Sequence, residues 1–250
     1  MNILNRPFGC EIEISTDFED VSPILKNAIK EVYQKPLLYA KNASFDSCIK
    51  TNKWHLKDDV TTMSEICTPI STFKDMKNIC KVAKALVQKD VKITNSDSFH
   101  VHVSASDVDP KNILACWLQY ESVIKSCFPK RRRKGEYCTE LINYRGKSKK
   151  NIAQFLIQAI DDSECHFSIM SFAHYSKRKT VEFRVSEGTL DPDHIRNWVK
   201  FCLYFVNYSK RVDPLMLVCD SVNNKTLSEM ILEIGIKDQE LIQWLRIREN

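Results

Sequence analysis

Four short segments of this 250-residue chain alternate apolar side chains with glutamate, histidine or arginine. A period of two is that of a β-strand with one apolar and one polar face. The segments are residues 7–14, 63–70, 98–105 and 180–186. Their polar side chains are Glu11, Glu13, Glu65, His100, His102, Glu182 and Arg184. Any one polar face is ordinary for a half-exposed antiparallel strand, so the argument depends on the four segments together.

The negative charges of clustered carboxylates must be compensated. Two of them about 4 Å apart repel by roughly 4 kcal/mol at an effective dielectric constant near 20, and a domain is stable by only about 5–15 kcal/mol. Carboxylates that converge in one cleft therefore either take up protons or bind metal. Glutamate and histidine suit Mg²⁺ or Mn²⁺, which in turn bind phosphate oxygens. Arg184, on the same face as Glu182, would add a fork-shaped phosphate donor.

Helical patterns separate these strands. Asp75 stands three residues after Thr72, in a capping-box position, and the pair Asp109–Pro110 gives a helix through about residue 127. Further helices are expected over 21–34 and 150–160, from Pro192 onward, and as two short helices in the tail from 213 to 250. Residues 165–172 are expected as a strand. The pattern predicts an α+β fold with no internal repeat and no linker that divides it.

Composition narrows the function classes. The ten cysteines form no CxxC pair, which argues against a zinc ribbon, and we expect buried thiols in a cytoplasmic, reducing setting. No segment has the length of a signal peptide core or a membrane span, so no membrane partner is expected. Trp54 and Trp198 are expected in the core. The net charge of +5 is too small to indicate a nucleic-acid partner.

The basic run from Lys130 to Lys134 has three interpretations. It is a solvated loop, a loop that binds phosphate or substrate, or a nucleic-acid patch. Asp58 and Asp59 likewise either form a turn or orient an incoming amine and accept its proton.

Five motifs occur in the order and spacing of a known family. They are FGCEIE near the N-terminus, WHLKDDVTTMSEICTPI, SFHVHVS, RRRKGEYC and TVEFRVSEGTLDP. With them the chain resembles the putative amidoligase family, which is related to glutamine synthetase and glutamate–cysteine ligase. The resemblance covers roughly residues 6–210, about four-fifths of the chain. Ser98 stands where family members often have glycine, two residues before the first histidine.

The resemblance implies a glutamine-synthetase-like fold, in which a curved antiparallel sheet forms a half-open barrel backed by helices. It implies one catalytic domain over 1–212. The tail over 213–250, which the resemblance does not cover, is expected as a helical extension packed on the same domain. The implied activity is that of an ATP-dependent carboxylate–amine ligase with Mg²⁺ or Mn²⁺. It would form an amide bond, peptide or isopeptide, between a small-molecule or peptide carboxylate and an amine through an acyl phosphate.

The resemblance also assigns roles to residues. The metal ligands are Glu11, Glu13, Glu65, His100 and Glu182. Nucleotide contacts fall to Arg184, Arg132, Arg133 and His102. The catalytic residues are Arg184 and Glu182, and Asp58 is the third on the amine-orienting interpretation given above. Whether His100 or His102 binds the metal stays open at this stage.

Two other functions fit the same residues. A metal-dependent hydrolase or nuclease also gathers glutamates and histidines around metal ions. A catalytically inactive relative would keep the face only for binding. ADP release that depends on both an acid and an amine separates the ligase from both, and the sequence names neither substrate nor the oligomeric state.

Overall fold

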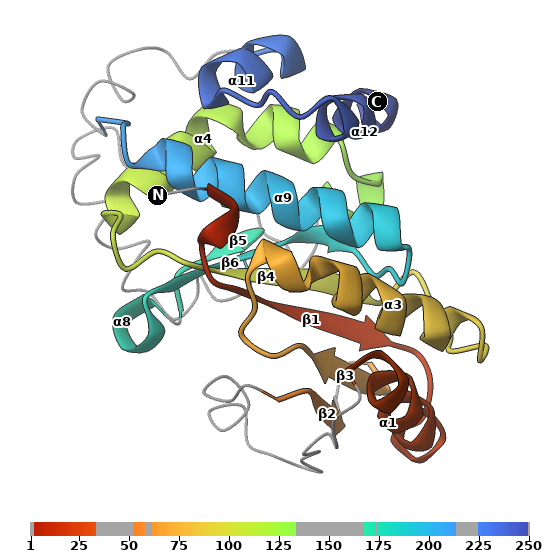
Figure 1. The fold of residues 1–250 in the computed structure, drawn as a ribbon. Helices are drawn as coiled ribbons and strands as arrows, with labels where there is room; N and C mark the ends of the chain where they lie inside the picture. The colour runs from red at the N-terminus through yellow and green to blue at the C-terminus, as the bar shows by residue number, and fades with distance from the viewer. Residues whose placement is uncertain are drawn as a thin grey trace. The chain divides into compact units, whose positions relative to one another are not determined.

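The computed structural model describes residues 3–33, 53–58, 62–133, 168–173, 175–213 and 225–249. The chain divides into two compact units, Met1–His102 with Ser186–Lys200, and Val103–Val185 with Phe201–Asn250. Six strands form an open antiparallel sheet in the order β2-β3-β1-β4-β6-β5 (Figure 1). The expected α+β class with an antiparallel sheet and helices is therefore confirmed. The predicted boundary at 212 stays a prediction.

The strands of the first unit are β1 (Phe8–Ile14), β2 (His55–Asp58), β3 (Ser64–Cys67) and most of β4 (Ser98–Ser104). The alternation in β1 is confirmed, because Cys10, Ile12 and Ile14 are at most 1% exposed and share the face opposite the glutamates. Burial of this apolar face is the main force that holds the strand in place.

Strand register brings distant polar residues together. Strands β1 and β3 pair antiparallel, with Glu11 opposite Cys67 and Glu13 opposite Glu65. Strands β2 and β3 also pair antiparallel, with Lys57 opposite Glu65. Directly opposite side chains lie on the same face of a sheet, so these pairings put Lys57 on the polar face.

The helices of the first unit are η1 (Ile3–Asn5), α1 (Phe18–Tyr33), η2 (Phe73–Asp75), α3 (Met76–Val87) and the start of α9 (Pro192–Ser209). Helix α1 packs against α3 and β2. It starts three residues before the expected position, with Glu19 and Asp20 in its first turn, where acidic side chains favour the helix dipole. The capping box is confirmed, since Thr72 N donates to Asp75 Oδ2 at 2.9 Å.

The second unit contains the end of β4, β5 (Met170–Ser171), most of β6 (Thr180–Glu187) and the remainder of α9. Its other helices are α4 (Pro110–Ser126), α5 (Lys130–Arg133), α8 (Tyr175–Arg178), α11 (Leu227–Ile234) and α12 (Gln239–Arg248). An aromatic core joins Trp117, Phe183 and Phe205, whose ring centroids lie 5.7–5.8 Å apart. The two expected tail helices, α11 and α12, are confirmed.

Some local expectations change. Lys130–Arg133 form one helical turn rather than a loop, because Arg132 N donates to Pro129 O at 2.8 Å and closes it. Of the expected strand over 165–172, Met170–Ser171 form β5, and residues 165–167 lie outside the described residues. Lys134, Asp59 and the expected helix over 150–160 lie outside the described residues. Trp54 and Trp198 are buried as expected.

Where the structure describes helices, none combines the length with the apolar composition needed to cross a membrane.

Candidate functional site

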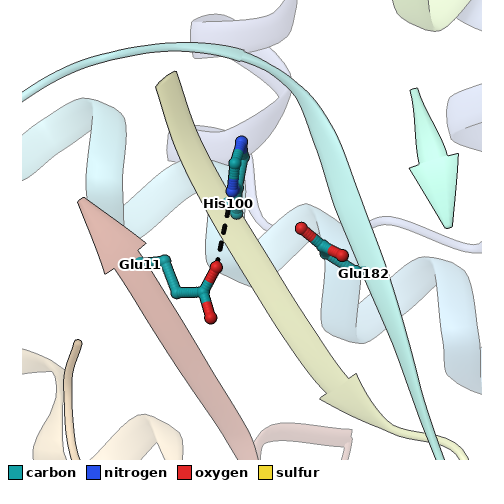
Figure 2. Close-up of side chains that lie close together, drawn as sticks. All are labelled: Glu11, His100 and Glu182. Carbon is teal, nitrogen blue, oxygen red and sulfur yellow. Dashed lines mark ion pairs between the residues drawn. The ribbon is translucent and has the colours of Figure 1, made fainter. Parts of the chain in front are cut away.

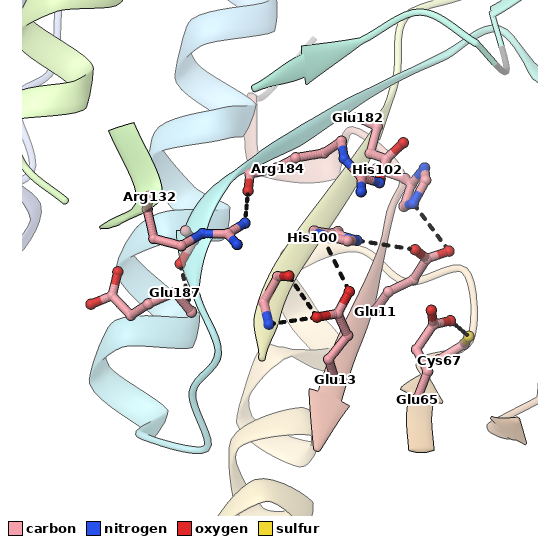
Figure 3. Close-up of polar contacts among 12 residues, drawn as sticks. Glu11, Glu13, Glu65, Cys67, His100, His102, Arg132, Glu182, Arg184 and Glu187 are labelled. Carbon is pink, nitrogen blue, oxygen red and sulfur yellow. Dashed lines mark hydrogen bonds and ion pairs between the residues drawn. The ribbon is translucent and has the colours of Figure 1, made fainter. Parts of the chain in front are cut away.

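The polar face of the strands in the first unit is buried rather than exposed to solvent. Each of its five predicted site residues is at most 7% exposed, a set that comprises Glu11, Glu13, Glu65, His100 and His102. They come from β1, β3 and β4, and their side chains gather beside one another (Figure 3). Charged groups at this depth are stable only with partners, so the contacts of each carboxylate decide what the face can do.

Glu11 lies between two imidazoles. Its Oε2 is 3.5 Å from His100 Nδ1 (Figure 2), and its Oε1 is 3.2 Å from His102 Nε2. Burial raises the pKa of Glu11, but the charge of His102 and the hydrogen-bonding imidazoles outweigh burial and hold the pKa well below 4.5. Glu11 is therefore an ionised carboxylate inside the protein.

Glu13 is held by the start of β4. The backbone N–H and the hydroxyl of Ser98 both donate to Glu13 Oε2, at 2.7 and 2.6 Å. His100 Nε2 lies 3.7 Å from Glu13 Oε1. The His100 ring thus faces Glu11 through one nitrogen and Glu13 through the other, and the Ser98 hydroxyl makes a bond that glycine at this position could not make.

Glu65 has an ammonium partner that the sequence analysis missed. Lys57 Nζ lies 2.5 Å from Glu65 Oε1, and the Cys67 thiol donates to the same oxygen at 3.0 Å. Burial and the charge of Glu11 outweigh Lys57 and raise the pKa of Glu65 to about 7. Burial lowers the pKa of Lys57, but the charge of Glu65 outweighs it and the pKa is raised. Both groups retain protons because the cluster has surplus negative charge.

A signal for Cys67, but none for Lys57, was present in the sequence. Cys67 stands two residues after Glu65 in SEIC, and so shares its face. Lys57 joins the cluster through the pairing of β2 with β3, which alternation within one segment does not specify.

In the second unit, Glu182 and Arg184 share a face of β6, as expected from their spacing. Arg184 Nη1 lies 2.5 Å from Glu182 Oε1, so the guanidinium supplies the charge that the buried carboxylate needs. Arg132 Nη2 donates to the backbone oxygen of Arg184 at 2.6 Å and holds the strand there. Arg133 donates to the oxygens of Phe128 and Ser126 at 2.7 and 3.0 Å, next to the C-terminal end of α4.

Asp58 is the last residue of β2 and is exposed. The other predicted site residues of the first unit lie around Glu11. They include both histidines, and the sequence did not decide which of the two binds metal.

The donor set of the first unit fits a divalent cation. One ligand atom each from Glu11, Glu65 and Cys67 lies within 4.8 Å of the other two, and all three residues are buried. Glu11 Oε1 lies 3.2 Å from His102 Nε2, whereas the contacts of Glu65 with Lys57 and Cys67 both fall on its Oε1. Glu65 therefore offers its second oxygen to an incoming ion.

Two comparisons with known proteins bear on this site. A family model described as "Putative amidoligase enzyme" matches residues 4–206, a span that contains every predicted site residue. No curated protein matches the chain.

Proposed function

This chain belongs to the putative amidoligase enzyme family, and from that membership we propose that it is an ATP-dependent carboxylate–amine ligase. The family gives the reaction class, a ligase that joins a carboxylate to an amine. The dependence on ATP and a divalent cation, the acyl phosphate and the glutamine-synthetase-like form of the sheet are parts of the proposal.

The observation that supports the proposal most is the buried polar face of β1, β3 and β4. Glu11 and Glu65 approach each other within the first unit, although 53 residues separate them in the sequence. Burying two carboxylates this close together costs stability, and a bound cation would offset that cost. A cation bound there lies where hydrogen bonds and burial have already ordered the ligands.

We assign cation binding to Glu11, Glu13, Glu65 and His100, with Glu182 as a further ligand. When bound, ATP supplies the phosphoryl group that activates the carboxylate as an acyl phosphate, and Mg²⁺ or Mn²⁺ neutralises the phosphate charge. Ser98 positions Glu13 through its two hydrogen bonds. The described contacts favour His100 as the metal ligand, because its ring faces both Glu11 and Glu13.

The phosphate contacts are assigned to Arg184, with His102, Arg132 and Arg133 as further nucleotide residues. Arg184 is 12% exposed in its side chain and presents a planar fork of donors that matches phosphate oxygens. Arg132 supports it by holding the backbone of the same residue. Asp58, exposed at the end of β2, is assigned to the amine, whose ammonium form it attracts and whose proton it accepts.

The test is ADP release by the purified chain with Mg²⁺ or Mn²⁺, ATP and a panel of paired carboxylates and amines. We expect ADP to form only when an acid and an amine are both present. Glu11→Gln and Glu182→Gln should each remove this activity, at least a hundredfold, because a neutral amide binds a divalent cation weakly. Arg184→Lys should also fail, since lysine makes no bidentate phosphate contact.

The matched control is Glu31→Gln, which removes an exposed carboxylate from α1 and should leave the rate unchanged. Full activity in Glu11→Gln would remove the metal assignment. Cleavage of a substrate without ATP would replace the ligase by a hydrolase.

A further inference from the structure

Cys67 lies among the carboxylates of the first unit. It is buried, forms no disulfide and stands directly opposite Glu11 in the β1–β3 register. Its thiol donates to Glu65 Oε1 at 3.0 Å, the contact drawn in Figure 3. The sulfur thus lies on the polar face, away from the apolar core where buried thiols are usually inert.

The three side chains can converge on one ion. Ligand atoms of Glu11, Glu65 and Cys67 lie within 4.8 Å of one another. In a tetrahedral site with bonds of about 2.0–2.3 Å, ligand atoms are roughly 3.5 Å apart. Small side-chain rotations close this difference, because all three residues are on adjacent paired strands.

With sulfur as a thiolate, the three ligands and Lys57 together carry a charge that one divalent ion neutralises. Two carboxylates and one thiolate carry three negative charges, and the Lys57 ammonium beside Glu65 leaves two. One divalent cation neutralises these. The Cys67 proton, and the proton held by Glu65, leave to solvent as the metal–ligand bonds form, so the exchange is balanced.

Donor type then selects the metal. Thiolate sulfur is a soft ligand that suits Zn²⁺ and other late first-row ions, whereas Mg²⁺ requires oxygen ligands in near-octahedral geometry. We propose that Glu11, Glu65 and Cys67 form a cation site for a thiolate-binding transition metal such as Zn²⁺ or Co²⁺, with a fourth position left for water or a substrate oxygen. This deepens the proposed function, on which it rests, by naming the class of a second cation that would share Glu11 and Glu65 with the one that accompanies the nucleotide.

The test uses Co²⁺ as the probe, added to the reduced full-length chain without nucleotide. We expect a sulfur-to-cobalt charge-transfer absorption that saturates at one equivalent. Cys67→Ser should lose this absorption and bind Co²⁺ at least tenfold more weakly. The matched control is Cys10→Ala, which removes a buried thiol from β1 on its opposite face and should retain the absorption.

A second variant tests whether loss of the absorption reflects misfolding. Cys67→Val places an apolar β-branched residue, which suits a strand, at this position. Its circular dichroism and melting temperature should match those of the parent while the absorption is lost. The proposal is overturned if the parent chain shows no such absorption, if Cys67→Ser keeps it, or if an equal concentration of Mg²⁺ displaces the cobalt.

The two proposals fail separately. Cobalt bound through Cys67 with no ADP release in any substrate pair would remove the ligase assignment and leave this site standing. ADP release with Mg²⁺ in a chain that shows no cobalt–thiolate absorption would do the opposite.

Discussion

Two neighbouring carboxylates, Glu11 and Glu65, offer ligand atoms within 4.8 Å of each other, yet their pKa values shift in opposite directions. Both are buried. Glu11 lies between His100 and His102, which stabilise its charged form. Glu65 has Lys57 on one oxygen but also feels the negative charge of Glu11, so its neutral form is favoured. The choice of partners, and not burial alone, decides which carboxylate holds a proton.

The raised pKa of Glu65 predicts a pH dependence of stability in the metal-free protein. Its pKa rises from 4.5 to about 7 on folding, so the folded state binds the proton more tightly than the unfolded state. The free energy of unfolding is then highest below pH 4.5 and falls as pH rises through 7, by at most about 1.4 kcal/mol per pH unit. Urea unfolding at pH 5 and 8 in the presence of EDTA measures this.

Glu65→Gln is the comparison, because it removes this proton from both states. The stability of the parent relative to the variant should decrease from pH 5 to 8, and a constant difference would contradict the assigned shift. Glu11 affects the free energy of unfolding in a different pH range. Its lowered pKa costs stability only as pH falls below about 4.5.

Ser98 should stabilise the first unit through Glu13. Ser98→Ala removes the 2.6 Å hydroxyl bond and keeps the backbone bond. A hydrogen bond to a charged group contributes about 1.5–3 kcal/mol, and we expect a loss in that range by urea unfolding. In a double-mutant cycle with Glu13→Gln, the cost of Ser98→Ala should shrink. An equal cost in both backgrounds would show that the serine acts elsewhere.

At the level of elements, the start of helix α4 is stabilised by an N-cap. Asp109 is its N-cap, with the side chain accepting from Lys111 N at 2.9 Å, and proline follows at the first helical position. Asp109→Ala should lower the free energy of unfolding by about 1 kcal/mol. Asp109→Ser retains a capping oxygen and should recover most of it. Equal losses in both variants would rule out capping as the cause.

The ends of β4 and β6 meet at Gly188, in the GTLDP motif. Gly188 N donates to Asp97 O at 2.8 Å, and a Cβ on Gly188 would lie 2.7 Å from Asp97 Cβ and 2.9 Å from its carbonyl carbon. Gly188→Ala should therefore cost about 1–3 kcal/mol through overpacking.

Gly9→Ala is the control for this close approach, since its Cβ would meet nothing within 4 Å. It should change the free energy of unfolding by at most about 0.5 kcal/mol. Thermal or urea unfolding of the two variants side by side decides the matter, and similar costs would mean that backbone contact is not the reason for glycine at 188.

For the molecule as a whole, the metal site predicts a link between ligand and stability. A cation that binds only the folded chain stabilises it by about 2.7 kcal/mol at a hundred times its Kd, and it would join β1 to β3 through Glu11 and Glu65. The melting temperature at pH 7.5 should therefore rise with Mn²⁺ or Zn²⁺ concentration. It should rise far less in Glu11→Gln, and an equal rise would place the bound cation elsewhere.

Local pattern was enough to predict most elements of this chain and the types of residue in its site. Alternation gave β1, β4 and β6, and Asp–Pro pairs gave the starts of α4 and α9, because these signals act within a few residues. The same alternation put Glu11, Glu13, His100 and His102 on polar faces. The basic composition of Lys130–Arg133 predicted a loop, whereas a backbone hydrogen bond from Arg132 N to Pro129 O closes a helical turn there.

Only the three-dimensional structure shows which residues are partners across strands. Lys57 beside Glu65, Cys67 opposite Glu11 and Ser98 on Glu13 all depend on the register between segments far apart in sequence. A shift of one residue turns every side chain to the other face, and that register is set by burial of the whole sheet rather than by any one strand. From the sequence, clustered acidic side chains indicated either bound protons or a bound metal ion. The folded structure adds lysine, arginine and serine partners, which are a third way to compensate the negative charge.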